Sequence, residues 1–584
     1  MTGLMRIAAL AALAALPAAA QAACTVAKYA ELPVTMASGY KPMVRAKING
    51  IDTEFIADSG AFYSLISPGT ARAANLKLEP GPFGFRLSGI GGTASVSLAR
   101  VADLNLAGVH LSKLEFMVGG SDTGTAGLIG QNILGIGDVE YDLPHGAIRL
   151  FKSQDCAKTL LAYWLGNNEP YSMLRIQPLK EAAFHTVGTV YVNGVALRAT
   201  FDTGAGSTTL SRHAAERLGV KPDDPGVVPA GFTRGLGSAV ARAWLAPFKT
   251  IKIGDEEIRN IKLRIADTDF QESDMLVGAD FFISHRVYVD NGAHRLFFSY
   301  TGGKVFDSAA HREGEAATAA APAAAEADAP RDADGFSRRG AVFLAQRDFT
   351  HAVADFTRAV ELAPKEPRFL LQRADAYART GRPFLAAADV NKALEIDPNN
   401  VSARMRRAQL RIAKGDREAA LADVDAASRA MVGPVNERME TASLYVALDR
   451  PDRAIGQLDA WIAAHPEDAS LPSALNERCW ARALAGVDLE KAVSDCNGAL
   501  RRRPKTPAYL DSRGLARLRL GDYDRAIEDF DAALRGNPKL AWSLYGRGLA
   551  RRHKGQAPAA EADFKAAADL QPGLADRARK LGID

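Results

Sequence analysis

The sequence lacks the short motifs that mark most metal and cofactor enzymes. Its 584 residues include no His-Glu-x-x-His and no Cys-x-x-Cys, and Gly135-Ile136-Gly137 is not followed by the basic residue or helix start of a phosphate loop. The net charge is only +4, and no basic stretch is interleaved with aromatic residues. We therefore expect a protein that needs no cofactor and no metal and does not bind nucleic acid.

Long apolar runs are also scarce. The one candidate, Ile7 to Ala20, follows Arg6 and precedes Ala20-Gln21-Ala22. A run this short does not comfortably span a bilayer, and its three parts match a secretory signal, predicted over residues 1–22. We expect an exported protein without a transmembrane span, located in a bacterial periplasm, with secretion or lipid attachment at Cys24 as alternatives.

Cysteines are few, with four in the whole chain. In an exported protein, four cysteines are typical of two disulfides. We expect Cys24 to pair with Cys156 and Cys479 with Cys496. Buried free thiols are the alternative.

Two aspartates each begin a short triplet at the end of an apolar run: Asp58-Ser59-Gly60 and Asp202-Thr203-Gly204. Other motifs repeat with nearly the same offset, namely Asn49-Gly50 with Asn193-Gly194, Ser67 with Ser211, and Leu128-Ile129-Gly130 with Leu276-Val277-Gly278. The chain therefore contains an internal duplication. A further triplet, Asp122-Thr123-Gly124, follows glycines instead of an apolar run and is interpreted as a loop.

Short segments rich in β-branched and aromatic residues fill both copies and predict two all-β lobes, at residues 28–155 and 180–302, with an irregular linker at 156–179. The Asn-Gly pairs predict hairpins whose second strand leads to the aspartate. Each copy also has a glycine-rich hairpin, with Gly89, Gly91 and Gly92 in the first and Gly235 and Gly237 in the second.

The composition changes after the second lobe. Residues 303–334 are rich in alanine, proline and acidic residues and predict a flexible spacer. From 335 to 584, small residues, glycines and prolines recur every 34 residues, as at Ala352, Ala386 and Ala420. Arginine clusters at 404–407 and 501–503 are typical of solvated helix faces.

This helical region resembles the tetratricopeptide repeat, with about seven repeats. The resemblance implies an all-α solenoid whose concave face binds a peptide or protein. In the fifth repeat, Cys479 and Cys496 take positions that normally face each other, which favours their disulfide.

The β region resembles a tandem of retropepsin-like aspartic protease domains, through the Asp-Ser/Thr-Gly-Ala strand ends, the flap hairpins and the Leu-Ile/Val-Gly motifs. The resemblance implies that Asp58 and Asp202 share a proton and activate water against a peptide bond. Ser59 and Thr203 are then expected to fix the pair by hydrogen bonds, while Gly60 and Gly204 allow close approach. The glycines of the two hairpins suit flaps that open and close.

We therefore expect an aspartic endopeptidase that acts on a polypeptide substrate, with a repeat domain that recruits substrate or partner. The alternative is an inactive protein that keeps the protease fold and serves as a peptide-binding scaffold. A further alternative is that each copy pairs with a second chain.

Overall fold

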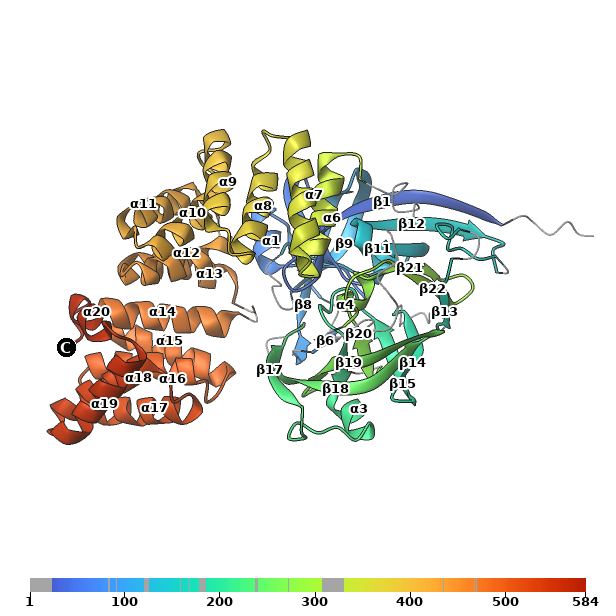
Figure 1. Cartoon of the computed structure of the whole chain (residues 1–584). Helices are drawn as coiled ribbons and strands as arrows, with labels where there is room; N and C mark the ends of the chain where they lie inside the picture. The colour runs from blue at the N-terminus through green and yellow to red at the C-terminus, as the bar shows by residue number, and fades with distance from the viewer. Residues whose placement is uncertain are drawn as a thin grey trace, which may run out of the picture.

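Figure 1 shows the computed structural model of the chain, in which two β lobes lie beside a curved stack of helices. The structure describes residues 24–584 except 82–84, 91, 120–124, 158, 167–168, 178–184, 237–239, 271–272, 307–329, 434, 467 and 469. The predicted signal peptide, flap residues Gly91 and Gly237, the Asp122 triplet and most of the predicted spacer lie outside the described residues.

Both lobes are built mainly of β strands. The first contains β1 (Thr25–Ala37), β2 (Lys41–Ile48), β3 (Ile51–Ala57), β4 (Leu65–Ile66), α1 (Pro68–Ala73), β5 (Leu78–Pro80), β6 (Leu87–Gly89), β7 (Gly92–Ala94), β8 (Val96–Leu106), β9 (Val109–Gly119), β10 (Gly127–Ile129), α2 (Gln131–Leu134), β11 (Asp138–Asp142), η1 (Leu143–His145) and β12 (Ala147–Gln154). The second contains β13 (Ser172–Arg175), β14 (Val187–Val192), β15 (Val195–Phe201), β16 (Thr209–Ser211), α3 (Arg212–Arg217), β17 (Val228–Thr233), β18 (Ala241–Ile253), β19 (Glu256–Ala266), β20 (Met275–Val277), α4 (Ala279–Phe282), β21 (His285–Asp290) and β22 (Arg295–Tyr300).

Asn-Gly turns set the register of the hairpin that leads to each aspartate. Asn49 and Gly50 have φ values of 49° and 87°, and Asn193 and Gly194 have 49° and 80°. Positive φ at both central residues gives a turn whose twist matches that of the flanking strands. The hairpins β2–β3 and β14–β15 therefore form as the sequence predicts.

Each of these hairpins ends at an aspartate, and the loop that begins there is fixed by strand pairing before and after it. In the two lobes, β3 and β15 pair in parallel with the short strands β10 and β20, which pair in turn with β4 and β16 beyond the loop. The Asp58 amide donates to the carbonyl of Ile129 at 2.9 Å, and the Asp202 amide to that of Val277 at 2.8 Å. The two loops are thus fixed in the same way.

Ser67 and Ser211 begin equivalent helices. Their hydroxyls accept hydrogen bonds from the amides of Thr70 and Ala214, in the first turns of α1 and α3. An N-cap of this kind contributes about 1 kcal/mol to helix stability. This shared role explains why both serines stand at the same distance from their aspartates.

One sheet runs through both lobes, in the order β13-β22-β21-β11-β12-β1 along this part. The lobes meet where β11 pairs antiparallel with β21, with Tyr141 opposite Val287. Every residue of both strands is buried. The side chains of Glu140 and Arg286 join across this seam at 2.7 Å. The lobes consequently share one continuous core.

Two predicted connecting segments are more structured than their composition indicates. The predicted linker 156–179 contains β13, which pairs with β22, and its Cys156 forms a disulfide with Cys24, with Cα atoms 4.6 Å apart. Within the predicted spacer, Val305 and Phe306 are buried. Irregular composition does not reveal a strand added at a sheet edge or two apolar residues anchored in a neighbouring core.

The described part of the C-terminal region forms seven antiparallel helix pairs and one final helix. The helices are α6 (Ala333–Ala345), α7 (Phe349–Leu362), α8 (Pro367–Arg379), α9 (Pro383–Ile396), α10 (Val401–Lys414), α11 (Arg417–Ala430), α12 (Glu437–Ala447), α13 (Pro451–Ala464), α14 (Leu471–Ala485), α15 (Leu489–Arg502), α16 (Pro507–Arg519), α17 (Tyr523–Gly536), α18 (Ala541–His553), α19 (Ala557–Leu570) and α20 (Leu574–Lys580). Among the described residues, none of the helices is long and apolar enough to cross a membrane.

A repeated ion pair joins the two helices of most pairs. An arginine of the first helix makes two hydrogen bonds to an aspartate of the second, and the pairs are Arg339–Asp355, Arg373–Asp389, Arg407–Asp423, Arg478–Asp495, Arg513–Asp529 and Arg547–Asp563. Arg407 therefore joins α10 to α11 through Asp423, although its arginine cluster predicts a solvated helix face. The aspartates are buried, so bidentate pairing offsets their desolvation.

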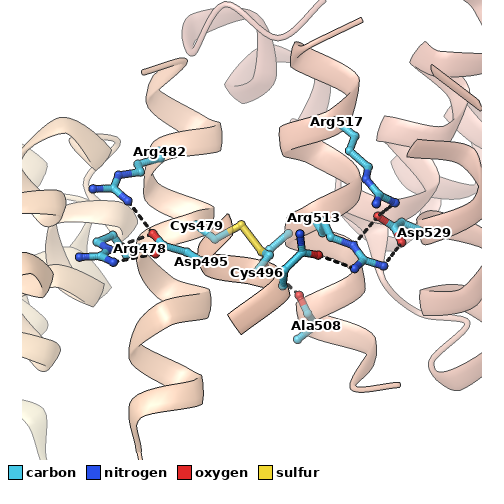
Figure 2. The surroundings of a disulfide bond; sticks show 11 residues. Arg478, Cys479, Arg482, Asp495, Cys496, Ala508, Arg513, Arg517 and Asp529 are labelled. Atoms are coloured by element: carbon cyan, nitrogen blue, oxygen red, sulfur yellow. Dashed lines mark hydrogen bonds and ion pairs between the residues drawn. A yellow bond between two sulfur atoms is a disulfide. The ribbon is translucent and has the colours of Figure 1, made fainter. Parts of the chain in front are cut away.

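The fifth helix pair carries a disulfide as well. Cys479 of α14 and Cys496 of α15 are bonded, with Cα atoms 5.6 Å apart. Figure 2 shows this bond between two clamps, with Arg478 and Arg482 on Asp495 at one side and Arg513 on Asp529 at the other.

Among the described residues, the solenoid contacts the lobes both at its start and along its middle. At its start, α6 packs on β1 and η1, and Gln346 donates to the carbonyl of Ile283 in the second lobe at 2.7 Å. Farther along, Arg72 of α1 donates to the carbonyls of Ala463 and Ala464 at the end of α13. The middle of the solenoid is thereby fixed beside the first lobe, as Figure 1 also shows.

Candidate active site

Asp58 and Asp202 lie together at the junction of the two lobes. Their carboxyl groups are in mutual hydrogen-bonding contact. Each carboxyl also lies over the glycine of the opposite triplet, so that a side chain at Gly60 would overlap Asp202 and one at Gly204 would overlap Asp58. The duplicated copies therefore complete one site within a single chain, and the alternative in which each copy pairs with a second chain does not describe this structure.

A crossed set of hydrogen bonds ties the two aspartate loops to each other. The Ser59 hydroxyl donates to the carbonyl of Phe201 at 2.9 Å and accepts from the Thr203 amide at 2.9 Å. The Thr203 hydroxyl donates to the carbonyl of Ala57 at 2.8 Å and accepts from the Ser59 amide at 3.0 Å. Ser59 and Thr203 are 1% and 0% exposed. The arrangement fixes the separation of the carboxyls through their neighbours.

Burial and mutual repulsion hold one proton on the pair. Burial raises the pKa of Asp58 well above its usual value, and the negative charge of Asp202 raises it further. Burial also raises the pKa of Asp202, but hydrogen bonds from Asp58 and from the amides of Ala205 and Gly204 oppose that rise. The two carboxyls therefore titrate as one coupled pair that holds a single proton between them.

The Leu-Ile/Val-Gly motifs pack beneath the aspartate loops. A Cβ on Gly130 would lie 2.8 Å from the carbonyl oxygen of Ala61, and one on Gly278 would lie 2.7 Å from that of Ala205. Only glycine fits at these close approaches. The Asp280 carboxylate, two residues after Gly278, accepts from the Thr208 amide and hydroxyl, and burial raises the pKa of Asp280 to about 6.

The two glycine-rich hairpins meet at their tips. A Cβ on Gly89 would lie 2.7 Å from the Cβ of Leu236, and one on Gly235 would lie 2.9 Å from the Cβ of Ile90. Gly92, with φ 98°, turns the first hairpin between β6 and β7. Each tip therefore places an aliphatic side chain over a glycine of the other.

Comparison with family models assigns both halves of the chain. Residues 44–133 match a model of aspartyl proteases, residues 188–284 match a model of gag-polyprotein aspartyl proteases, and residues 337–401 and 512–575 match a tetratricopeptide repeat model. The chain carries two aspartyl protease domains followed by tetratricopeptide repeats. The fold class predicted from the sequence is thereby confirmed.

The solved structures similar to this chain include several tetratricopeptide repeat proteins. The tetratricopeptide repeat protein YrrB is 20% identical, covers 38% of this chain and 97% of its own, and has a TM-score of 0.24. A tetratricopeptide repeat protein from Parabacteroides merdae is 17% identical, with a TM-score of 0.34. The match covers 43% of this chain and 98% of that protein. The TPR2B domain of yeast Sti1 is 32% identical, with a TM-score of 0.20. The match covers 20% of this chain and 96% of that domain. A comparison with curated proteins gives no match.

The sequence pattern does not indicate one residue beside the protease aspartates. His185 precedes β14, and its charge lowers the pKa of Asp202. Its imidazole lies edge-on to the ring of Phe62, with centroids 6.4 Å apart, four residues after Asp58. A single histidine in an irregular segment carries no motif. Only its place at the start of the second duplicated hairpin could have drawn attention to it.

Proposed function

We propose that the protein is an aspartic endopeptidase whose active site is formed by Asp58 and Asp202. The observation that supports this proposal is the contact between the two carboxyl groups across the lobe junction. Two carboxyls that share one proton supply an acid and a base from identical groups.

In this proposal water is the nucleophile. The Asp202 carboxylate accepts a proton from water as the oxygen attacks the peptide carbonyl carbon, while Asp58 donates its proton to the carbonyl oxygen. The tetrahedral intermediate then loses the amine: the nitrogen takes a proton from Asp202, the carbon–nitrogen bond breaks, and one hydroxyl of the intermediate gives its proton back to Asp58 as the new carboxyl group forms. The site regains its starting state.

The repeats and the disulfides support the remaining parts of the proposal. Stacked helix pairs present an extended concave surface suited to a peptide or protein, so we assign the solenoid the role of recruiting substrate or partner. Two disulfides are suited to an oxidising compartment. They support export to a bacterial periplasm.

The test compares three isosteric substitutions, Asp58→Asn, Asp202→Asn and Asp122→Asn, on cleavage of a reduced, carboxymethylated protein over pH 4 to 8. Either of the first two should lower cleavage by at least a thousandfold, because each removes one half of the acid–base pair. Asp122→Asn is the control, since it alters the same kind of triplet where the sequence has glycines before it instead of an apolar run. Circular dichroism checks that each variant is folded.

Cleavage that persists in Asp202→Asn would refute the shared pair. A wild-type protein that cuts no substrate at any pH, yet binds peptide, would favour the scaffold alternative. Mixing the two inactive variants distinguishes the intermolecular arrangement, which alone predicts recovered cleavage.

A further inference from the structure

A cavity of about 180 Å³ opens on the solenoid between α12 and α14. Its lining consists of Ala442, Ser443, Val446, Leu458, Glu477 and Trp480. Ala442 and Leu458 are buried and form the floor, while Ser443 is exposed and Glu477 and Trp480 are partly exposed. The cavity is thus apolar below and reachable from solvent above.

The carboxylate of Glu477 has no cationic partner among the described residues. Its hydrogen bond is a long one, 3.5 Å, from the hydroxyl of Ser443. The neighbouring Arg478 is turned away, toward Asp459 and Asp495. Burial raises the pKa of Glu477 to about 7, opposed only by the Ser443 hydroxyl. The Glu477 carboxylate therefore lacks the arginine partner that each buried aspartate of the repeated ion pairs has.

Trp480, three residues after Glu477 on α14, adds an aromatic ring to the lining of the cavity. Trp480 is held edge-on by Trp542, with ring centroids 5.4 Å apart and planes at 87°. The first helices α14, α16 and α18 are neighbours, and Trp480 of α14 contacts Trp542 of α18 on one face of the solenoid. The cavity on that face offers a carboxylate and an aromatic ring to a positively charged group.

We propose that this cavity binds a lysine or arginine side chain of a polypeptide that lies along the same face. An ammonium or guanidinium group supplies the missing hydrogen-bond donors and neutralises Glu477, and its stem packs on the apolar floor. The face of Trp480 adds a cation–π contact. The inference deepens the recruiting role proposed above by assigning the recruited segment a basic residue, but it does not depend on catalysis.

The test measures peptide binding to full-length protein carrying Asp202→Asn, which prevents cleavage. Decapeptides identical except for a central lysine, arginine, Nε-acetyl-lysine or glutamate are titrated by calorimetry at pH 8. The lysine or arginine peptide should bind on the order of tenfold more tightly than the acetyl-lysine and glutamate peptides, because only a positively charged side chain pairs with the carboxylate of Glu477.

Glu477→Gln should abolish this preference without changing the fold, because glutamine keeps the size of the side chain. Trp480→Phe should weaken binding of both basic peptides, and Glu561→Gln, on an exposed position of α19, should leave it unchanged. Equal affinity for lysine and acetyl-lysine peptides, no binding of any peptide, or a preference that survives Glu477→Gln would overturn the inference. Because binding is measured on the cleavage-deficient protein, its loss is distinguishable from failure of the protease proposal.

Discussion

Replacing Thr203 by valine tests the crossed hydrogen bonds beneath the dyad. Valine keeps the shape of threonine but removes the hydroxyl, which donates to Ala57 and accepts from Ser59. Both partners are main-chain groups in a buried environment. Leaving a buried group unsatisfied costs about 1–3 kcal/mol, so two such groups predict a loss of roughly 2–6 kcal/mol.

This loss is large beside the roughly 5–15 kcal/mol that stabilises a typical domain. At about 2–4 °C per kcal/mol for a unit of this size, a mid-range loss lowers the melting temperature of the lobes by roughly 8–16 °C. Thr203→Ser is the matched control, since it keeps the hydroxyl and deletes one methyl group, at about 1 kcal/mol.

The assay combines calorimetry of the full chain with amide hydrogen exchange at Ser59. In Thr203→Val the lobe transition should shift and the Ser59 amide should exchange faster, while the solenoid transition stays in place. If Thr203→Val melts within 1 °C of the wild type and the Ser59 amide remains protected, the hydrogen bonds do not hold the loops together and the reasoning fails.

Three other outcomes are expected. His185→Ala should raise the pKa of Asp202, because it removes a positive charge, and should move the acidic limb of the kcat/KM profile to higher pH; an unmoved limb would contradict the role given to the histidine. Asp280, whose carboxyl has a pKa of about 6 in the folded chain against 3.8 ordinarily, should contribute stability below pH 4 that is lost as pH rises through 6, by about 3 kcal/mol. Asp280→Asn should remove this pH dependence in urea unfolding, and a difference curve that is flat with pH would refute it. Replacing both Cys479 and Cys496 by alanine should destabilise the solenoid by about 3 kcal/mol, given their sequence separation of 17, as read from its circular dichroism melting curve; an unchanged curve would show that the bond adds nothing.

The duplicated architecture was predictable because its signals are local. Asn-Gly pairs fix hairpins through positive φ, Ser67 and Ser211 cap helices, and Gly130 and Gly278 stand where a side chain would collide with the loop above. Each depends on a few neighbouring residues, so each leaves a short motif that repeats in both copies.

Features made by distant segments were not predictable in this way. β13 pairs with a strand more than a hundred residues away. His185 is nearer in sequence, because the β14–β15 register pairs Val187 with Thr200 and so brings His185 beside Asp202, but no motif marks it. The ion pair between Arg407 and Asp423 was only partly predictable. It joins two helices, but its spacing of 16 residues recurs through the solenoid. A search of the sequence for that interval would separate such internal arginines from solvated ones.

The strand pairing between β11 and β21 joins the two halves within one chain, so their sequences need not stay identical. A cleft assembled from separate identical subunits falls apart on dilution and must keep both subunits alike. Here covalent linkage and a common sheet keep the halves joined at any concentration, and each half is free to drift. The triplets differ by a serine and a threonine, and the two tips by an isoleucine and a leucine, so the two halves of the site are not identical.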